Sequence, residues 1–123
     1  MSHETSLPQE LPEWRLPITT TLVVSTAIAT RDFQDVHHDR DLAQSYGSKD
    51  IFLNILTTTG LVQRYVTDSL GHDVDLAGIA LRLGAPAYPG DELVFSGTRD
   101  GDTVAVVGKV SLGDHVTATV TLR

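Results

Sequence analysis

Asp32 and His37 are the two residues whose types and spacing could do chemistry. They lie five residues apart in the segment 30–50, which holds two adjacent histidines within a run of aspartates. On one unbroken helix, five residues place two side chains roughly 140° apart around the axis, so they could not meet at one point. The chain would have to leave the helix between them, with residues 33–36 forming a turn. A carboxylate and an imidazole that converge on one water would then form a general acid–base pair.

Less reactive interpretations of the same segment stay open. In a chain with 16 Asp and Glu residues, an Asp and a His five residues apart often occur by chance. Asp32 could then be a turn residue or a helix terminator. We expect His38 and Asp39 to be solvated loop residues. A metal site built from His37, His38 and Asp39 is disfavoured, because adjacent side chains rarely point at one ion. We therefore expect no metal.

Residues 50–71 carry the clearest helical pattern in the chain. Asp50 can cap the start of this helix, and Gly71 can end it. The apolar residues extend well beyond one stripe, which indicates a helix that is enclosed by other structure. At helical spacing they are Phe52, Ile55, Leu56, Val62, Val66 and Leu70, and the stripe is widened by Ile51, Leu53, Leu61 and Tyr65.

Residues 74–123 are predicted to form a series of strands that wrap this helix. Turn signals separate the strands at residues 85–91, 100–102 and 112–114. In the last strand, apolar residues alternate with threonines, so one face is apolar and the other polar. His72 and His115 fall at apparent turns with no partner in view. Antiparallel strands around one central helix make an α+β fold.

Residues 19–30 are ambiguous. They are rich in β-branched residues and by propensity alone would form a strand. Residues 19–21 could instead cap a helix, and propensity is a weak guide. Before this segment, residues 1–13 include Pro8 and Pro12 and are predicted to form a loose N-terminal arm. Residues 14–123 are predicted to form a single domain.

Composition limits the kinds of partner. The formal net charge is -7, and there are nine Lys and Arg residues in 123. Nucleic acids and anionic membranes are bound mainly through basic clusters, so neither is expected as a partner. The chain has no cysteine, which excludes disulfides and thiolate chemistry. We find no signal-peptide pattern and no apolar run long enough to span a membrane, and we expect a cytoplasmic protein.

The segment 30–37 resembles the signature of the MaoC-like (R)-specific enoyl-CoA hydratases. In that family a helix ends in a Ser-Gly-Asp-x-Asn-Pro-x-His-like segment. Here the chain has Thr30-Arg31-Asp32-Phe33-Gln34-Asp35-Val36-His37, then Asp39 and Leu42-Ala43. The resemblance covers nearly all of the chain after the N-terminal arm. It implies the hot-dog fold, in which an antiparallel sheet wraps one long helix, and it implies that residues 19–30 are largely the helix that leads into the catalytic turn.

Residues 23–68 resemble, more narrowly, the small subunits of heteromeric enoyl-CoA hydratases that act on steroid side chains in cholesterol-degrading bacteria. This resemblance implies hydration of a steroid that carries a short unsaturated side-chain CoA thioester. The product would be a tertiary alcohol that a thiolase-like aldolase can cleave. CoA is then part of the substrate, so no separate cofactor is expected.

The resemblance also assigns roles to residues. Asp32 and His37 would hold a water over the β-carbon of the thioester and take its proton as it adds. The family's His-Gly aligns with Leu53-Asn54, so the backbone N–H of Asn54 would stabilise charge on the thioester oxygen. Because the family's Gly is absent, Asn54 as a plain helix residue stays open.

The resembled small subunits pair with a larger hot-dog subunit, so a heterotetramer of two small and two large chains is expected. The resemblance implies that the larger subunit lacks the acid–histidine pair and that its appended domain docks the aldolase. An ordinary homodimer, a non-catalytic hot-dog subunit that stabilises or orients an active partner, and a hot-dog thioesterase are the alternatives. Candidate cations for the CoA phosphates are Arg31, Arg40, Lys49, Arg64 and Arg82.

Overall fold

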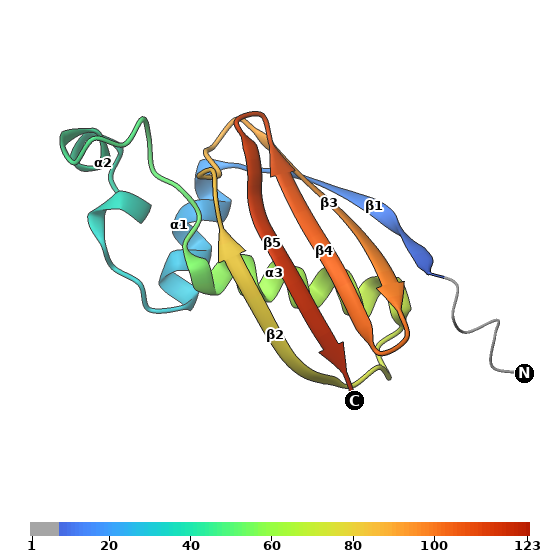
Figure 1. Cartoon of the computed structure of the whole chain (residues 1–123). Helices are drawn as coiled ribbons and strands as arrows, with labels where there is room; N and C mark the ends of the chain where they lie inside the picture. Colours follow the sequence, from blue (N-terminus) through green and yellow to red (C-terminus); the bar gives the residue numbers. More distant parts are fainter. Residues whose placement is uncertain (1–7) are drawn as a thin grey trace, which may run out of the picture.

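The computed structural model describes residues 8–123, and in it one long helix lies against a five-stranded sheet (Figure 1). The strands are β1 (Gln9–Pro17), β2 (Leu76–Leu83), β3 (Glu92–Asp100), β4 (Thr103–Val110) and β5 (Gly113–Leu122). All neighbours pair antiparallel, in the order β1-β3-β4-β5-β2. The central helix is α3 (Ile55–Leu70). This arrangement confirms the predicted α+β fold and has the layers that the hot-dog resemblance implies.

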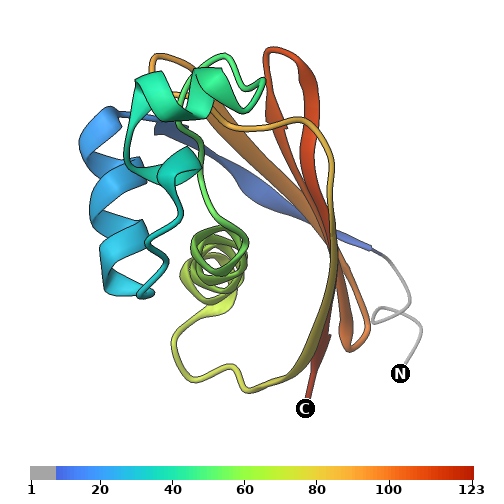
Figure 2. The same cartoon turned by 90° about the vertical axis from the view of Figure 1, so that its left-hand side faces the viewer.

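The sheet curves around one side of α3. Figure 2 looks down the helix axis and shows the sheet on one side and α1 (Thr20–Ala29) on the other. In β5 the apolar residues from Val116 to Leu122 are buried, and the threonines between them are exposed. The alternation predicted for the last strand is therefore confirmed, as are turns at the three predicted places.

The first strand corrects the predicted arm. Residues 1–7 lie outside the described residues, but residues 9–13 belong to β1 and pair with β3. Leu11 is buried in the core, and the Tyr65 hydroxyl of α3 donates to the Pro12 carbonyl at 2.7 Å. Pro12 does not mark a loose chain. It lies in an edge strand, at a register shift between Leu11 and Trp14, where a missing N–H is tolerated.

Residues 20–29 form the helix α1, as the resemblance implied and against the strand propensity. The Thr19 hydroxyl oxygen accepts from the Leu22 N–H at 3.0 Å and caps the helix. Val23 and Ala27, one turn apart, are buried. Burial of this side outweighs the modest helix propensity of the β-branched residues, because tertiary packing routinely overrides propensity.

The central helix begins later than predicted. It starts at Ile55, with Asn54 and not Asp50 as its N-cap, while Ile51 and Leu53 are buried in the extended segment before it. Its C-cap is Gly71, with φ of 112°, as predicted. The helix is also less enclosed than predicted, because its first two residues, Ile55 and Leu56, are 51% and 57% exposed.

Aromatic stacking joins α3 to the sheet. The Tyr65 ring stacks on Phe95 of β3 with centroids 5.6 Å apart, and Phe95 stacks on Trp14 of β1 at 5.4 Å. Such pairs add to the stability that their buried area already supplies. Among the described residues, no helix is long and apolar enough to cross a membrane. The stacked rings hold α3 against the sheet. Its N-terminus lies at the end of the sheet where α1 lies, and α2 (Arg40–Ser45) lies farther out on that side (Figure 1).

Candidate active site

Asp32 is positioned by the way in which α1 ends. The Arg31 N–H donates to the Ile28 carbonyl at 2.9 Å, and the Asp32 N–H donates to the Ala27 carbonyl at 2.8 Å. These two bonds form a Schellman motif, in which the residue after the C-cap adopts a left-handed conformation. Here that residue is Arg31, with φ of 58°. Asp32 therefore follows the helix end in a defined orientation.

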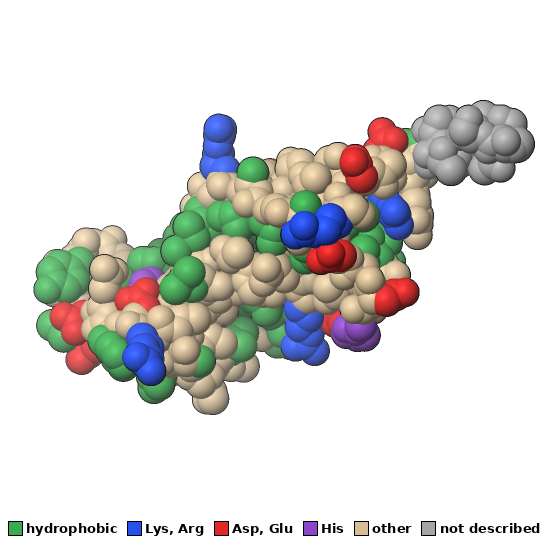
Figure 3. Space-filling view, turned by 90° about the horizontal axis from the view of Figure 1, so that it is seen from below, with side chains coloured by type: hydrophobic (Ala, Val, Ile, Leu, Met, Phe, Trp, Pro, Cys, Tyr) green, Lys and Arg blue, Asp and Glu red, His purple; other side chains and the backbone are tan. Residues whose placement is uncertain are grey.

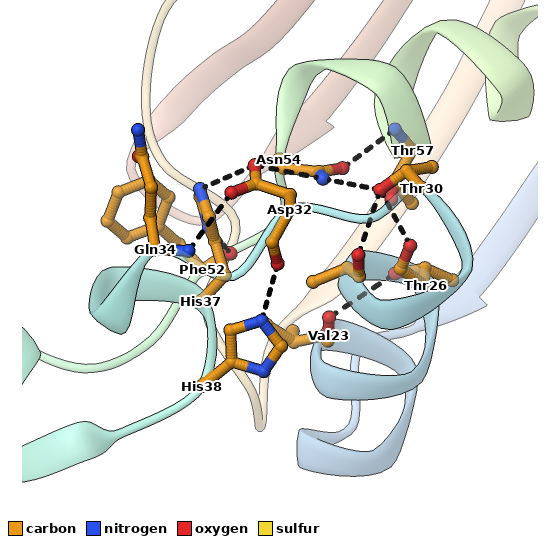
Figure 4. Close-up of polar contacts among 11 residues, drawn as sticks. Val23, Thr26, Thr30, Asp32, Gln34, His37, His38, Phe52, Asn54 and Thr57 are labelled. Atoms are coloured by element: carbon orange, nitrogen blue, oxygen red, sulfur yellow. Dashed lines mark hydrogen bonds and ion pairs between the residues drawn. The ribbon is translucent and has the colours of Figure 1, made fainter.

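A tight turn then returns the chain to Asp32. The Gln34 N–H donates to Asp32 Oδ1 at 3.2 Å, and residues 35–37 form the short 3₁₀ helix η2 (Asp35–His37). This turn brings His37 Nε2 to 3.3 Å from Asp32 Oδ2 (Figure 4). The chain leaves the helix between the two residues, and the structure brings the two side chains together.

The tautomer of His37 follows from its second contact. His37 Nδ1 lies 2.7 Å from the Phe52 carbonyl oxygen, which can only accept, so Nδ1 carries a hydrogen. In a neutral ring, Nε2 then presents a lone pair toward the Asp32 carboxylate. The imidazole is buried, while the Asp32 side chain is 24% exposed. A proton or a water shared between the two acceptors fits this geometry, which is what acid–base chemistry requires.

The Asp32 carboxyl is held in its ionised form. Burial raises its pKa, but the Gln34 N–H and the Asn54 side chain donate to the carboxylate, and His37 and His38 add favourable charge. The hydrogen bonds and charges outweigh burial, so the pKa of Asp32 lies below its ordinary value. The group is therefore a carboxylate at neutral pH.

Asn54 lies in the site, and it contributes through its side chain. Its Oδ1 accepts from the Thr57 N–H at 2.8 Å and caps α3, and its Nδ2 donates to Thr30 Oγ1 at 2.8 Å and to Asp32 Oδ2 at 3.2 Å. The side-chain role was not predicted. Asn is a common N-cap residue whose side chain accepts from the N–H three residues later, so an Asn just before the apolar helical pattern could have indicated this role.

The backbone at the start of α3 presents free donors. Within the described chain, no carbonyl or side-chain oxygen accepts from the N–H groups of Asn54, Ile55 or Leu56. Helix N-termini leave such donors unpaired and carry partial positive charge. Asn54 has φ of -85° and ψ of 166°, which any residue adopts. The absence of glycine at this position therefore imposes no strain on the backbone.

His38, Asp39 and His115, which the sequence analysis left without partners, each have one in the structure. His38 Nε2 contacts the Asp32 carbonyl, and the Asp39 carboxylate caps α2 by accepting from the Leu42 N–H at 3.1 Å, so neither is a plain loop residue. His115 is buried, with Nδ1 2.8 Å from the Ala85 carbonyl and Nε2 2.8 Å from Thr58 Oγ1. The prediction that it lacks a partner is wrong, because folding brings α3 beside the start of β5.

His72, also expected to lack a partner, lies 3.6 Å from the Asp68 carboxylate. Across residues 8–123, no three His, Cys, Asp or Glu side chains are grouped as metal ligands would be. Three of the candidate cations have neighbours of their own: Arg40 lies 3.8 Å from Asp50, Arg64 lies 3.3 Å from Asp68, and Lys49 lies over the Tyr88 ring.

Some hollows of the surface lie elsewhere. Two, of about 440 and 480 Å³, are lined by strand residues, among them Ala105 and Val107 of β4. Neither is lined by Asp32 or His37. The chemistry of the acid–imidazole pair, and not the size of a hollow, therefore locates the candidate site.

Comparison with known proteins places this geometry in context. No protein-family model matches the sequence. The 3-oxo-4,17-pregnadiene-20-carboxyl-CoA hydratase beta subunit of Mycobacterium tuberculosis (strain ATCC 25618 / H37Rv) is 62% identical over 117 residues, which are 91% of each chain. A chain in the crystal structure of the ChsH1-ChsH2 complex from M. tuberculosis is 56% identical, with a TM-score of 0.89 over 95% of this chain and 98% of that one.

More distant structures share the fold. The (R)-hydratase from A. caviae, involved in PHA biosynthesis, is 17% identical, with a TM-score of 0.83 over 95% of each chain. A MaoC-like dehydratase is 23% identical, with a TM-score of 0.82 over 95% of this chain and 40% of that one. These two likenesses establish the hot-dog architecture.

Proposed function

Because this chain belongs to the MaoC-like hot-dog enoyl-CoA hydratases, we propose that it is the catalytic small subunit of a hydratase acting on a steroid side-chain enoyl-CoA thioester. The observation that carries the proposal is the contact of 3.3 Å between the His37 imidazole and the Asp32 carboxylate. A non-catalytic subunit that orients an active partner would have no need of this pair. We therefore rank the catalytic role first.

The pair activates water. The Phe52 carbonyl holds the hydrogen of His37 on Nδ1, so Nε2 is the nitrogen that exchanges a proton. A water hydrogen-bonded to both Nε2 and the Asp32 carboxylate loses a proton to the pair as its oxygen bonds to the β-carbon of the thioester. The pair then delivers that proton to the α-carbon. The sum is addition of H and OH across the double bond.

The start of α3 stabilises the developing charge. Electron density moves to the thioester oxygen as the new bond forms, and preorganised N–H donors stabilise such a charge without reorganisation. The unpaired Asn54 N–H and the partial positive charge of the helix N-terminus support this role. The ordinary backbone conformation of Asn54, reached without a glycine, also supports this role.

The substrate class rests on the mycobacterial relative, whose name specifies a steroid CoA thioester. At 62% identity over nine-tenths of both chains, the same class of acyl group is the best-supported substrate. The hydroxylated product would suit a carbon–carbon cleavage by a thiolase-like aldolase, as the sequence resemblance implies.

A second subunit completes the enzyme in this proposal. The similar mycobacterial chain was solved within a complex of two named components. In this chain β1 and β2 are edge strands, and Ile55 and Leu56 are exposed on α3, so a partner could cover both. We propose that the partner is a larger hot-dog subunit and that two small and two large chains form a heterotetramer. An aldolase docks through the larger subunit.

The deciding test is a hydration assay on the co-purified complex with a panel of enoyl-CoA thioesters. We expect a steroid side-chain thioester to be hydrated with a much higher kcat/KM than crotonyl-CoA. Equal or better turnover of short linear thioesters would overturn the steroid substrate while leaving the hydratase. Absence of hydration on every thioester, with the partner present, would overturn the catalytic proposal itself.

A further inference from the structure

The Asn54 carboxamide joins three elements at the candidate site. Its side chain is buried, and it contacts Thr30 at the end of α1, Asp32 in the turn and Thr57 in the first turn of α3 (Figure 4). Both ends of the amide are in use. The helix cap and the acid are therefore held by one side chain.

The orientation of the amide is determined by its neighbours. The Thr57 N–H can only donate, so the atom 2.8 Å from it is the amide oxygen. The Asp32 carboxylate can only accept, so the atom 3.2 Å from Oδ2 is the amide nitrogen. A flipped amide would turn its NH₂ group toward the Thr57 N–H and its oxygen toward the Asp32 carboxylate. Donor would then face donor, and acceptor would face acceptor. The cap thus aims the NH₂ group at the acid.

Each oxygen of Asp32 has its own donor. Oδ1 accepts from the Gln34 N–H, while Oδ2 accepts from the Asn54 NH₂ and lies 3.3 Å from His37 Nε2. The titratable groups that face Asp32 are His37 and His38, and both lie in or beside η2. Asn54 is the contact from the opposite side of the carboxylate, and it comes from α3.

We propose that the side chain of Asn54 is a positioning residue, which holds Oδ2 of Asp32 toward Nε2 of His37 and couples the acid to the N-terminus of α3. This inference rests on the proposed hydratase function. It assigns to the side chain of Asn54 a role that is separate from that of its backbone N–H. Hydrogen bonds to an ionised group are roughly twice as strong as neutral ones, so loss of this donor destabilises the carboxylate form.

The main test is Asn54→Asp, measured in the complex with its partner. Aspartate caps a helix as well as asparagine does, so α3 and the backbone N–H are retained. The donor is replaced by a second carboxylate facing Asp32. We expect the acidic limb of the kcat/KM profile to move up by about one pH unit or more. We also expect kcat at neutral pH to fall roughly tenfold or more, because Oδ2 of Asp32 is no longer held toward His37.

Two further variants separate positioning from stability. Asn54→Ser keeps an oxygen for the cap but lacks the NH₂ group, so we expect a smaller shift of the acidic limb in the same direction. Thr19→Ala removes the cap of α1, which lies away from Asp32, and serves as the matched control. It should lower the unfolding temperature and leave the pH profile unchanged.

A direct readout keeps this inference apart from the proposed function. NMR titration of the Asp32 carboxyl carbon, in wild type and in Asn54→Asp, follows the acid without any substrate. We expect the Asp32 midpoint to rise in the variant. Unchanged midpoints and unchanged pH profiles in folded Asn54 variants would overturn the positioning role. An inactive wild-type complex would overturn the hydratase proposal, and the titration would still decide the coupling.

Discussion

At the scale of single residues, the pairing of His37 with Asp32 depends on a backbone carbonyl that neither residue supplies. The Phe52 carbonyl accepts from Nδ1 at 2.7 Å and fixes which nitrogen faces the acid. The Phe52 ring also lies edge-on to the imidazole, with centroids 5.0 Å apart. A histidine without these contacts could rotate about χ2 and present either nitrogen.

Replacement of either member of the pair should remove most of the hydration. We expect Asp32→Asn and His37→Ala each to lower kcat by about 10²–10⁴-fold, because that is the usual loss when a positioned acid or base is removed. The measurement is turnover of the enoyl thioester by the complex, with circular dichroism as the control for folding. Near-normal turnover by either folded variant would contradict the assignment.

At the scale of elements, the end of α1 combines a functional position with a strained residue. Arg31 occupies the left-handed position of the Schellman motif with φ of 58°, where a side chain other than glycine is unfavourable. The hydrogen bonds on both sides of Arg31 hold it there. The geometry that aims Asp32 is therefore maintained at a cost in local stability.

Relief of this strain should stabilise the fold. We expect Arg31→Gly to raise the free energy of unfolding by about 0.5–1 kcal/mol, since glycine adopts positive φ without a Cβ penalty. Urea denaturation of the two proteins measures the difference. Ala29→Gly, at an exposed position in the last turn of α1, is the matched control and should be destabilising, because glycine in a helix loses more conformational entropy on folding than alanine does. A less stable Arg31→Gly protein would contradict the strain argument.

His115 joins α3, β5 and the loop before β3 through neutral hydrogen bonds. Burial lowers its pKa, and the bond to the Ala85 carbonyl opposes this less strongly. The ring contacts the Thr58 hydroxyl and the Ala85 carbonyl, both of which are uncharged. The neighbouring acid, Asp114, is exposed. The folded protein therefore keeps the ring neutral at a pH where the unfolded chain already binds a proton.

Stability should consequently depend on pH through this residue. As pH falls, the unfolded chain takes up a proton near 6.5 and the folded chain only at lower pH, so the contribution of His115 is full above 6.5 and is lost below it. We expect wild type to exceed His115→Gln in unfolding free energy by about 1–3 kcal/mol near neutral pH. The gap should narrow at about pH 5.5. Urea denaturation at both pH values measures it, and a constant gap would contradict the argument.

At the scale of the whole molecule, features of the surface support the proposed partner subunit. Figure 3 shows isolated cationic side chains between hydrophobic and acidic ones on the face seen from below. A CoA diphosphate needs cationic contacts, which a chain of net charge -7 supplies sparsely. Edge strands and exposed apolar residues on α3 point the same way.

Assembly should therefore depend on the exposed start of α3. We expect Leu56→Glu to weaken association with the partner, because the charge would have to be buried at the joint. Leu112→Glu is the control, since Leu112 is 64% exposed in the turn between β4 and β5. Size-exclusion chromatography with light scattering measures the complexes. A well-behaved homodimer of the isolated chain, with full hydratase activity, would contradict the heteromer.

Local pattern alone determined much of this protein. The alternation of apolar residues and threonines in β5, the three turns and Gly71 at the end of α3 follow from side-chain periodicity and backbone preference, which act within a few residues. Resemblance to a family motif was needed for α1, where propensity pointed to a strand. Asp32 and His37 could be selected as a pair, but spacing alone left their meeting open.

Tertiary structure decided the rest. The N-cap of α3 is Asn54 and not the predicted Asp50, because the chain before the helix is buried in extended form, with the Leu53 N–H bonded to the Ala87 carbonyl. Residues 9–13 form a strand because they pair with β3, which would otherwise be the edge strand of the sheet. The contacts of Asn54 with Thr30 and Asp32 span 24 and 22 residues, and that of His115 with Thr58 spans 57. No periodicity records such partners, because they exist only once distant segments have packed together.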